Sequence, residues 1–204
     1  MLVHSYLYYE RDESIISDAQ WSKWAMELVQ LQKDYPEEAS QVEFADMFKD
    51  WDGSSGAFLT YNNAIIETAT NTLVVACINT VIPKDVTAIG KNAFNLYQNP
   101  TIEIPENVES IGSYAFMNSA IREIILPDNI TKIGASAFDT CLRLQKITLP
   151  QNIKVIEKYT FNNCGLHNVE IPDSVNIIGE KAFAGNSSLS SVVIGSGVKK
   201  IEAY

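Results

Sequence analysis

Few side chains in this sequence have the types and spacing that catalysis or metal binding requires. The chain has two histidines, His4 and His167, and three cysteines, Cys77, Cys141 and Cys164. A zinc site needs three or four such ligands together, and these residues do not form a set of that size. The sequence also has no Ser-His-Asp spacing and no phosphate-cradling glycine loop. We therefore expect no catalytic residue and no metal site, and we interpret the chain as not an enzyme.

Two of the cysteines occupy equivalent places in the sequence. Cys141 and Cys164 each follow a phenylalanine by three residues, at Phe138 and Phe161. Free cysteine is among the most frequently buried residue types. We expect the pair to form part of a buried, half-polar ladder rather than a metal site, and we expect Cys77 to lie in the core as well.

The charge of the chain limits its partners. The 204 residues carry a formal net charge of -10. Residues 1–60 hold 12 acids and 4 bases (net -8), whereas residues 61–204 hold 13 acids and 11 bases (net -2). Nucleic-acid binding requires clustered lysine and arginine, so we expect no nucleic-acid partner.

The start of the sequence has neither a basic segment nor the apolar run of a secretory signal. No apolar stretch approaches the length of a membrane span. We therefore expect a cytoplasmic protein without a membrane partner.

The elements that position the side chains come from an internal repeat. Each copy reads Ile/Leu-Pro, an aliphatic residue three positions later, Ile-Gly three positions after that, and then Ala-Phe. Successive copies are offset by 22 or 23 residues, within the range for leucine-rich repeats. The fourth copy has Glu157 and Thr160 in place of Gly and Ala. Five full copies and a partial sixth begin at Ile82, Ile104, Leu126, Leu149, Ile171 and Ile194.

Each position of the motif has a physical role. The residues before each proline alternate between apolar and polar, which predicts a short strand with one buried face. Proline cannot donate to a strand ladder, so it ends the strand. We expect the glycine to permit a turn with positive φ, and the small alanine to let the backbone approach while the phenylalanine enters the core.

This motif resembles the BspA-type (Treponema-type) leucine-rich repeat over roughly residues 76–204. The resemblance implies a right-handed solenoid over residues 78–204, with parallel strands on one face. Residues 61–77 are predicted to form a β-hairpin cap that turns at Ala69–Asn71. With a helical module over residues 1–60, the expected fold class is α+β.

In a solenoid of this kind the side chains between the core positions point outward and form a continuous surface. Acidic and apolar residues alternate there, which favours a protein partner with a basic surface. The alternative is that valine and isoleucine occur there only through strand propensity. The predicted partner-binding residues are Glu103, Glu123, Ile125, Lys146, Thr148, Asn168, Glu170 and Val193.

Residues 1–60 have helical spacing of apolar residues, and Ser17 to Gln20 form a capping box. This segment resembles the Ia subdomain of bacterial NAD-dependent DNA ligases, including ligase-related proteins of phages. By that resemblance, four residues fall on nucleotide-contacting sites, and the ligand would be NAD or nicotinamide mononucleotide (NMN). The alternative is a helical hairpin whose aromatic residues pack on one another. The four residues are Tyr8, Tyr9, Asp18 and Trp21.

Ligase chemistry itself is not expected. The family places its nucleophilic lysine in K-x-D-G, whereas Lys49 is followed by Asp52-Gly53 in a K-x-x-D-G spacing. The first hypothesis is therefore a non-catalytic adaptor or inhibitor, and the second is a module that binds a nicotinamide nucleotide and is targeted by its repeats. The sixth copy stops before its Ala-Phe, which predicts either a missing C-terminal cap or an open edge covered by another chain, and this coil is a candidate site for homodimerisation.

Overall fold

The computed structural model describes residues 58–61, 64–77 and 79–202. The chain divides into two compact units, Met1–Thr60 and Tyr61–Tyr204, and the architecture below is that of the second. Every regular element among the described residues is a β-strand. This part of the chain is a β-solenoid, as predicted, and the helices that made the predicted fold class α+β lie at residues 1–60, outside the described residues.

A hairpin precedes the coils, as predicted. β2 (Ala64–Glu67) pairs antiparallel with β3 (Thr72–Ala76), and β1 (Phe58–Tyr61) continues the same sheet. The turn between β2 and β3 contains Asn71 at φ 50°, a conformation that asparagine tolerates well. β3 pairs in parallel with β4 (Ala88–Ile89), so the hairpin supplies hydrogen bonds to the first coil.

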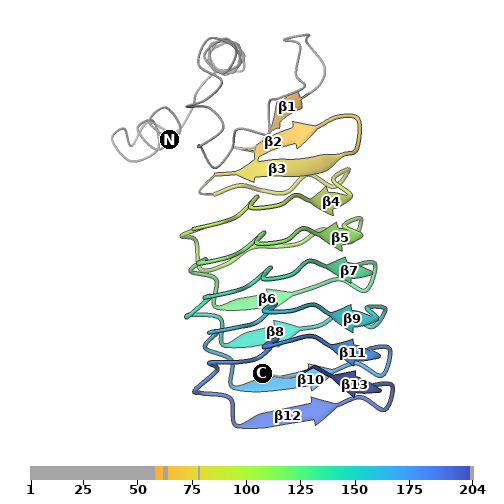
Figure 1. Ribbon diagram of the computed structural model, residues 1–204. Helices are drawn as coiled ribbons and strands as arrows, with labels where there is room; N and C mark the ends of the chain where they lie inside the picture. Colours follow the sequence, from red (N-terminus) through yellow and green to blue (C-terminus); the bar gives the residue numbers. More distant parts are fainter. Residues whose placement is uncertain (1–57, 62–63, 78, 203–204) are drawn as a thin grey trace, which may run out of the picture. The chain divides into compact units, whose positions relative to one another are not determined.

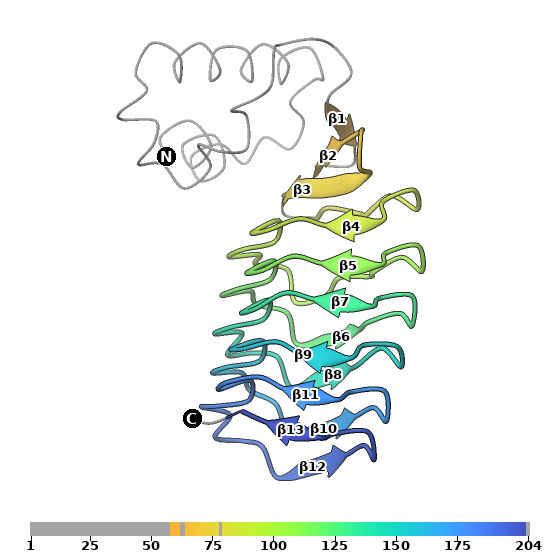
Figure 2. The same ribbon diagram turned by 45° about the vertical axis from the view of Figure 1, so that its right-hand side comes forward.

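The coils stack through strands on two faces, where the sequence predicted one (Figures 1 and 2). The first, which we call the pre-proline face, consists of the strands that the sequence predicted before each proline. The second, which we call the Ile-Gly face, consists of two-residue strands at the Ile-Gly motif. Two residues are too few to show an alternating pattern, so sequence periodicity could not predict them. The pre-proline face comprises β6 (Glu123–Ile125), β8 (Lys146–Thr148), β10 (Asn168–Ile171) and β12 (Ser191–Ile194). The Ile-Gly face comprises β4, β5 (Ser110–Ile111), β7 (Lys132–Ile133), β9 (Val155–Ile156), β11 (Ile177–Ile178) and β13 (Lys200–Ile201).

The phenylalanine of each copy enters the core, as predicted. Phe94, Phe116, Phe138 and Phe161 are at most 1% exposed and stack in one column through the coils. Phe183 ends the column and is half-buried against the same core. Because each ring packs on the ring of the next coil, one coil cannot bury its apolar residues without its neighbours.

The prediction for the repeat glycine was wrong. None of Gly90, Gly112, Gly134 and Gly179 has a positive φ. A Cβ atom on Gly134 would instead lie 2.4 Å from the backbone nitrogen of Ser113 in the preceding coil. The glycine is therefore needed because the backbones of adjacent coils approach closely.

Positive φ values occur two residues after each motif glycine, at the start of the arc that carries Ala-Phe. Asn92, Tyr114 and Ser136 have φ between 56° and 60°, and their equivalents in the next two copies have φ of 58° and 52°. This geometry turns alternate amides toward the following coil. The amide of Phe116, for example, donates to the carbonyl of Ala137 at 2.7 Å. These arcs form a third hydrogen-bonded ladder along the solenoid.

The last described coil is the most exposed one. Val192, Ile194 and Ile201 are 42%, 51% and 61% exposed, although equivalent residues of earlier coils belong to the core. Association of two copies through this coil remains a prediction.

Candidate binding surface

All eight residues predicted to contact a partner are exposed, and the structure gathers them on the pre-proline face. β6 and β8 pair in parallel, which places Glu123 beside Lys146 and Ile125 beside Thr148. β10 and β12 pair in the same manner, so Glu170 lies beside Val193. Alternate residues of these strands point inward, and the remaining side chains form two outward columns. Their role in binding remains a prediction.

The pre-proline face exposes large apolar side chains. Ile125 is 72% exposed, Val193 is 58% exposed, and Val81 in the equivalent position of the first copy is 64% exposed. Single exposed valines need no explanation. These three, however, occupy the same column and alternate with Glu103, Thr148 and Glu170. The column therefore combines apolar contact area with carboxylates.

The carboxylates of this face are free of ion pairs. Among the described residues the structure has one ion pair, which joins Lys200 and Glu202 on the last coil. Glu103, Glu123 and Glu170 therefore remain available to a charged partner. Charges at the rim of an interface increase association rates and select partners of opposite sign.

The pre-proline face is interrupted between β8 and β10. β6 and β8 form one two-stranded sheet, and β10 and β12 form another. The two sheets are joined only before the strands, where the amide of His167 donates to the carbonyl of Gln145 at 3.2 Å. The pre-proline face therefore has no strand pairing between Ile147 of β8 and Val169 of β10.

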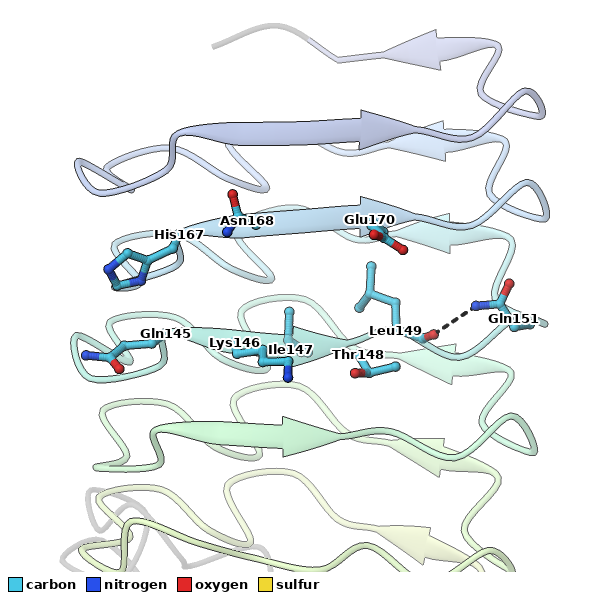
Figure 3. Close-up of a pocket in the computed structure, with 9 residues that line it drawn as sticks. All are labelled: Gln145, Lys146, Ile147, Thr148, Leu149, Gln151, His167, Asn168 and Glu170. Atoms are coloured by element: carbon cyan, nitrogen blue, oxygen red, sulfur yellow. Dashed lines mark hydrogen bonds between the residues drawn. The ribbon is translucent and has the colours of Figure 1, made fainter.

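A hollow of about 440 Å³ lies at this opening (Figure 3). Its lining is mixed, with Ile147 and Leu149 beside one lysine and one glutamate on different strands. Four of the eight predicted binding residues line it. Residues on the β8 side include Lys146, Thr148 and Gln151, and residues on the β10 side include His167, Asn168 and Glu170.

The coil that carries β8 and β9 is also the copy that departs from the repeat motif. Glu157 stands where the other full copies have glycine, and its amide has no counterpart to the Gly134 bond to Ile111, at 2.8 Å, among the described backbone hydrogen bonds. β7 and β9 accordingly belong to different sheets. Glu202 of the partial sixth copy also replaces this glycine, but its amide donates to the carbonyl of Ile178 at 2.9 Å, so a Cβ atom alone does not explain the bond that Glu157 lacks.

The spacing of the phenylalanine column also marks the coil of β8 and β9 as different from the others. The ring centroids are 4.9 Å apart for Phe94–Phe116 and 5.0 Å apart for Phe116–Phe138. They are 5.5 Å apart for Phe138–Phe161 and 5.3 Å apart for Phe161–Phe183. Both wider steps involve the coil of β8 and β9, so the two sheet interruptions lie on either side of the same coil.

The cysteine ladder is confirmed. Cys141 and Cys164 are buried, and their thiols donate to the carbonyls of Phe116 and Phe138 at 3.0 and 3.1 Å. The hydrogen bond to Cys141 and burial raise the pKa of the Cys164 thiol. Cys77 was expected in the core but is only half-buried, because it follows the hairpin at the edge of the first coil.

The remaining predictions concern a nucleotide site, metal sites and membrane-spanning helices. Tyr8, Tyr9, Asp18 and Trp21 lie outside the described residues. Within the described part, no three or more histidine, cysteine or acidic side chains are grouped as metal ligands. A search of the same residues finds no helix that could cross a membrane.

Sequence reasoning found the outward columns but missed the hollow. Gln145, Gln151 and His167 were not among the predicted binding residues, although Gln145 and His167 are exposed. The substitution of Glu157 for the motif glycine was visible in the sequence. Together with Thr160 in place of the motif alanine, it was the available signal that this coil differs, and its consequence becomes clear only once the role of glycine is known.

The comparison with family models identifies the repeat. The model of the BspA type leucine rich repeat region matches residues 74–190 with six copies. Because this match covers more than half of the chain, the protein belongs to that family. No curated protein matches the sequence.

Solved structures share the fold. A leucine-rich repeat protein from Eubacterium ventriosum is 23% identical over 72% of this chain and 42% of its own, with a TM-score of 0.65. The pneumococcal vaccine antigen PcpA is also 23% identical, over 70% and 40%, with a TM-score of 0.56. A leucine-rich repeat protein of T. pallidum is 27% identical over 66% of each chain, with a TM-score of 0.55. The chain thus spans less than half the length of the first two.

Proposed function

We propose that this chain is a non-catalytic binding module whose pre-proline face recognises a protein partner with a basic surface. Leucine-rich repeat proteins typically mediate protein interactions, and an extended solenoid face suits that role. The observation that carries the proposal is the column in which exposed Ile125 and Val193 alternate with unpaired Glu103 and Glu170. Such a mixture combines apolar burial with charge selection.

A charge-reversal experiment tests the proposal. The full chain is immobilised, partners are captured from extracts of the native host, and the captured protein is purified and its affinity measured. The triple variant Glu103→Lys, Glu123→Lys and Glu170→Lys should weaken this affinity at least about a hundredfold, as truncated interfacial charge pairs do.

The matched control applies the same change in charge elsewhere. Asp85, Glu106 and Glu109 are also exposed and have no side-chain hydrogen bond among those of the described residues. Their triple replacement by lysine should leave the affinity within about threefold, a change expected for rim charges alone. Equal losses in both variants would show that net charge, and not the pre-proline face, governs capture.

A second candidate function rests on the sequence of residues 1–60, which resembles the Ia subdomain of NAD-dependent ligases. It is that Tyr8, Tyr9, Asp18 and Trp21 bind NAD or NMN. Calorimetry of the full chain with each nucleotide should then give saturable heat below millimolar concentration, and Asp18→Ala should remove it. No heat for the unaltered chain at that concentration would eliminate this candidate.

A further inference from the structure

The column of the repeat that contains Cys141 and Cys164 has sulfur in two adjacent coils. The other full copies have Tyr97, Ser119 and Asn186 at this position, so only one step of the solenoid has a thiol on both sides. Both cysteines are buried, at 0% and 4% exposed. The proposed binding surface uses neither thiol, because it consists of the outward columns of the pre-proline face.

The backbone holds these two coils side by side at the cysteines. The amide of Thr140 donates to the carbonyl of Asn162 at 2.8 Å. Three residues before each cysteine, the ring centroids of Phe138 and Phe161 are 5.5 Å apart. A disulfide requires a Cα separation of about 4.4–6.8 Å, so one coil step has the length that a bridge between equivalent cysteines needs.

The two thiols meet beside one carbonyl. The carbonyl of Phe138 accepts a bond from the amide of Cys141 at 3.2 Å and one from the thiol of Cys164 at 3.1 Å. The thiol of Cys164 also forms a hydrogen bond with the sulfur of Cys141, and this bond lowers the pKa of the Cys141 thiol. Cys141 is therefore the member of the pair that more readily forms the nucleophilic thiolate.

The step between these coils is also the loosest one along the column. It is the widest of the four steps between stacked phenylalanine rings, and β8 and β10, which follow the two cysteines, do not pair. Gln145 and His167 lie four and three residues after the cysteines, are exposed and line the hollow. The backbone that carries the thiols thus borders solvent at the hollow, and the missing strand pairing gives the coils room to adjust to a bond between the sulfurs.

We infer that Cys141 and Cys164 are a peroxide-sensitive pair that closes to a disulfide between adjacent coils. The Cys141 thiolate attacks one oxygen of hydrogen peroxide, the O–O bond breaks, and a sulfenic acid forms on Cys141. The hydroxide that leaves takes up the proton lost from Cys141 and becomes water. The thiol of Cys164 then attacks the Cys141 sulfur, so that the S–S bond forms, the S–O bond breaks and a second water leaves. The two thiols are oxidised and the peroxide is reduced.

Thiol labelling of the full chain tests the inference. The chain is treated with hydrogen peroxide, unfolded in the presence of N-ethylmaleimide and measured by mass spectrometry. The untreated chain should carry a label on each of its three cysteines, whereas the treated chain should lose the labels of Cys141 and Cys164 and yield a proteolytic peptide pair that links them. A reductant should restore both labels. Full labelling after peroxide, or loss of label without the linked pair, would contradict the inference.

Two serine variants separate the roles of the thiols. Ser119 already occupies this column, so the fold should accept serine in the adjacent coils. Cys164→Ser removes the second thiol, so peroxide should leave a sulfenic acid on Cys141 that dimedone traps. Cys141→Ser should give no such adduct and should keep its label on Cys164. Equal trapping in the two variants would show two independent thiols and overturn the inference.

Discussion

The coils that carry β5 and β7 keep the motif glycine and alanine, whereas the coil that carries β8 and β9 has Glu157 and Thr160 in their places. The first two have Gly112 and Gly134, and their strands continue one sheet from the hairpin. The third has Glu157, and the sheet ends before it. The arc ladder nevertheless crosses both regions, since Phe138 donates to Thr160 at 2.9 Å and Phe161 donates to Ala182 at 2.8 Å.

This difference shows how a repeat protein can acquire a local site without losing its core. The arcs and the phenylalanine column hold the stack together, so one face can lose its ladder while the coils remain in contact. The hollow on the pre-proline face adjoins the coil in which this happens. Departures from the motif in solenoids are therefore places to look for binding sites.

The largest effect should come from the column that both regions share. Phe138→Ala removes a ring that is 0% exposed and stacked on both sides, and should cost about 3–5 kcal/mol of unfolding free energy. Phe183→Ala removes a half-buried ring at the end of the column and should cost about half as much, because less apolar area is lost. Urea unfolding of both variants measures the difference. Equal losses would mean that the coils do not share one continuous core.

The next effect should come from the motif glycine. Gly134→Ala places a Cβ atom 2.4 Å from the backbone of Ser113, so the coils must separate, at a cost of about 1–3 kcal/mol. Glu157→Ala is the matched control, because this position already carries a Cβ atom and should change stability by less than about 0.5 kcal/mol. A neutral Gly134→Ala variant would refute the proposed role of glycine.

Replacing Glu157 by the motif glycine should change the free energy of unfolding only slightly. It should, however, clearly change the protection of an amide from hydrogen exchange. Glu157→Gly removes the side chain between the coils of β7 and β9, and we expect a regained hydrogen bond of about 1 kcal/mol to be offset by a similar entropic cost of glycine. The amide of residue 157 should nevertheless exchange with solvent more slowly than in the unaltered chain. Unchanged exchange would show that the interruption has another cause.

The smallest effect is a pH dependence in the last coil. The Asp173 carboxylate accepts bonds from the amide and hydroxyl of Ser196 at 2.6 and 2.9 Å, and these bonds lower the pKa of Asp173. A carboxyl whose folded pKa is depressed stabilises the fold above its unfolded pKa, and this contribution is lost as the pH falls through the folded value.

Thermal unfolding as a function of pH measures this contribution. Asp173→Ala should lower the melting temperature at neutral pH, and its difference from the unaltered chain should shrink on acidification. Glu106→Ala replaces the equivalent residue of an earlier copy, which has no side-chain hydrogen bond among those of the described residues, and should show no such trend. A difference that grows in acid would mean that the Asp173 carboxylate does not stabilise the fold through its charged form.

The sequence alone predicted the repeat, its phenylalanine column and the outward residues, because long-range order in a solenoid follows from a short local motif. Predicting the Ile-Gly face required knowledge of which backbone groups pair across coils, which two-residue strands do not reveal. The role of the glycine was misassigned for the same reason. A turn with positive φ is a local property, whereas the close approach at Gly134 involves Ser113 in another coil.

Amide hydrogen exchange of the unaltered chain tests the central claim most directly, namely that one coil departs from an otherwise continuous ladder. The amides of Gly112, Gly134 and Gly179, which donate to the preceding coil at 2.7–2.8 Å, should be strongly protected. The amide of Glu157 should exchange much faster, although it lies between them in the stack. Equal protection at all four positions would contradict the account.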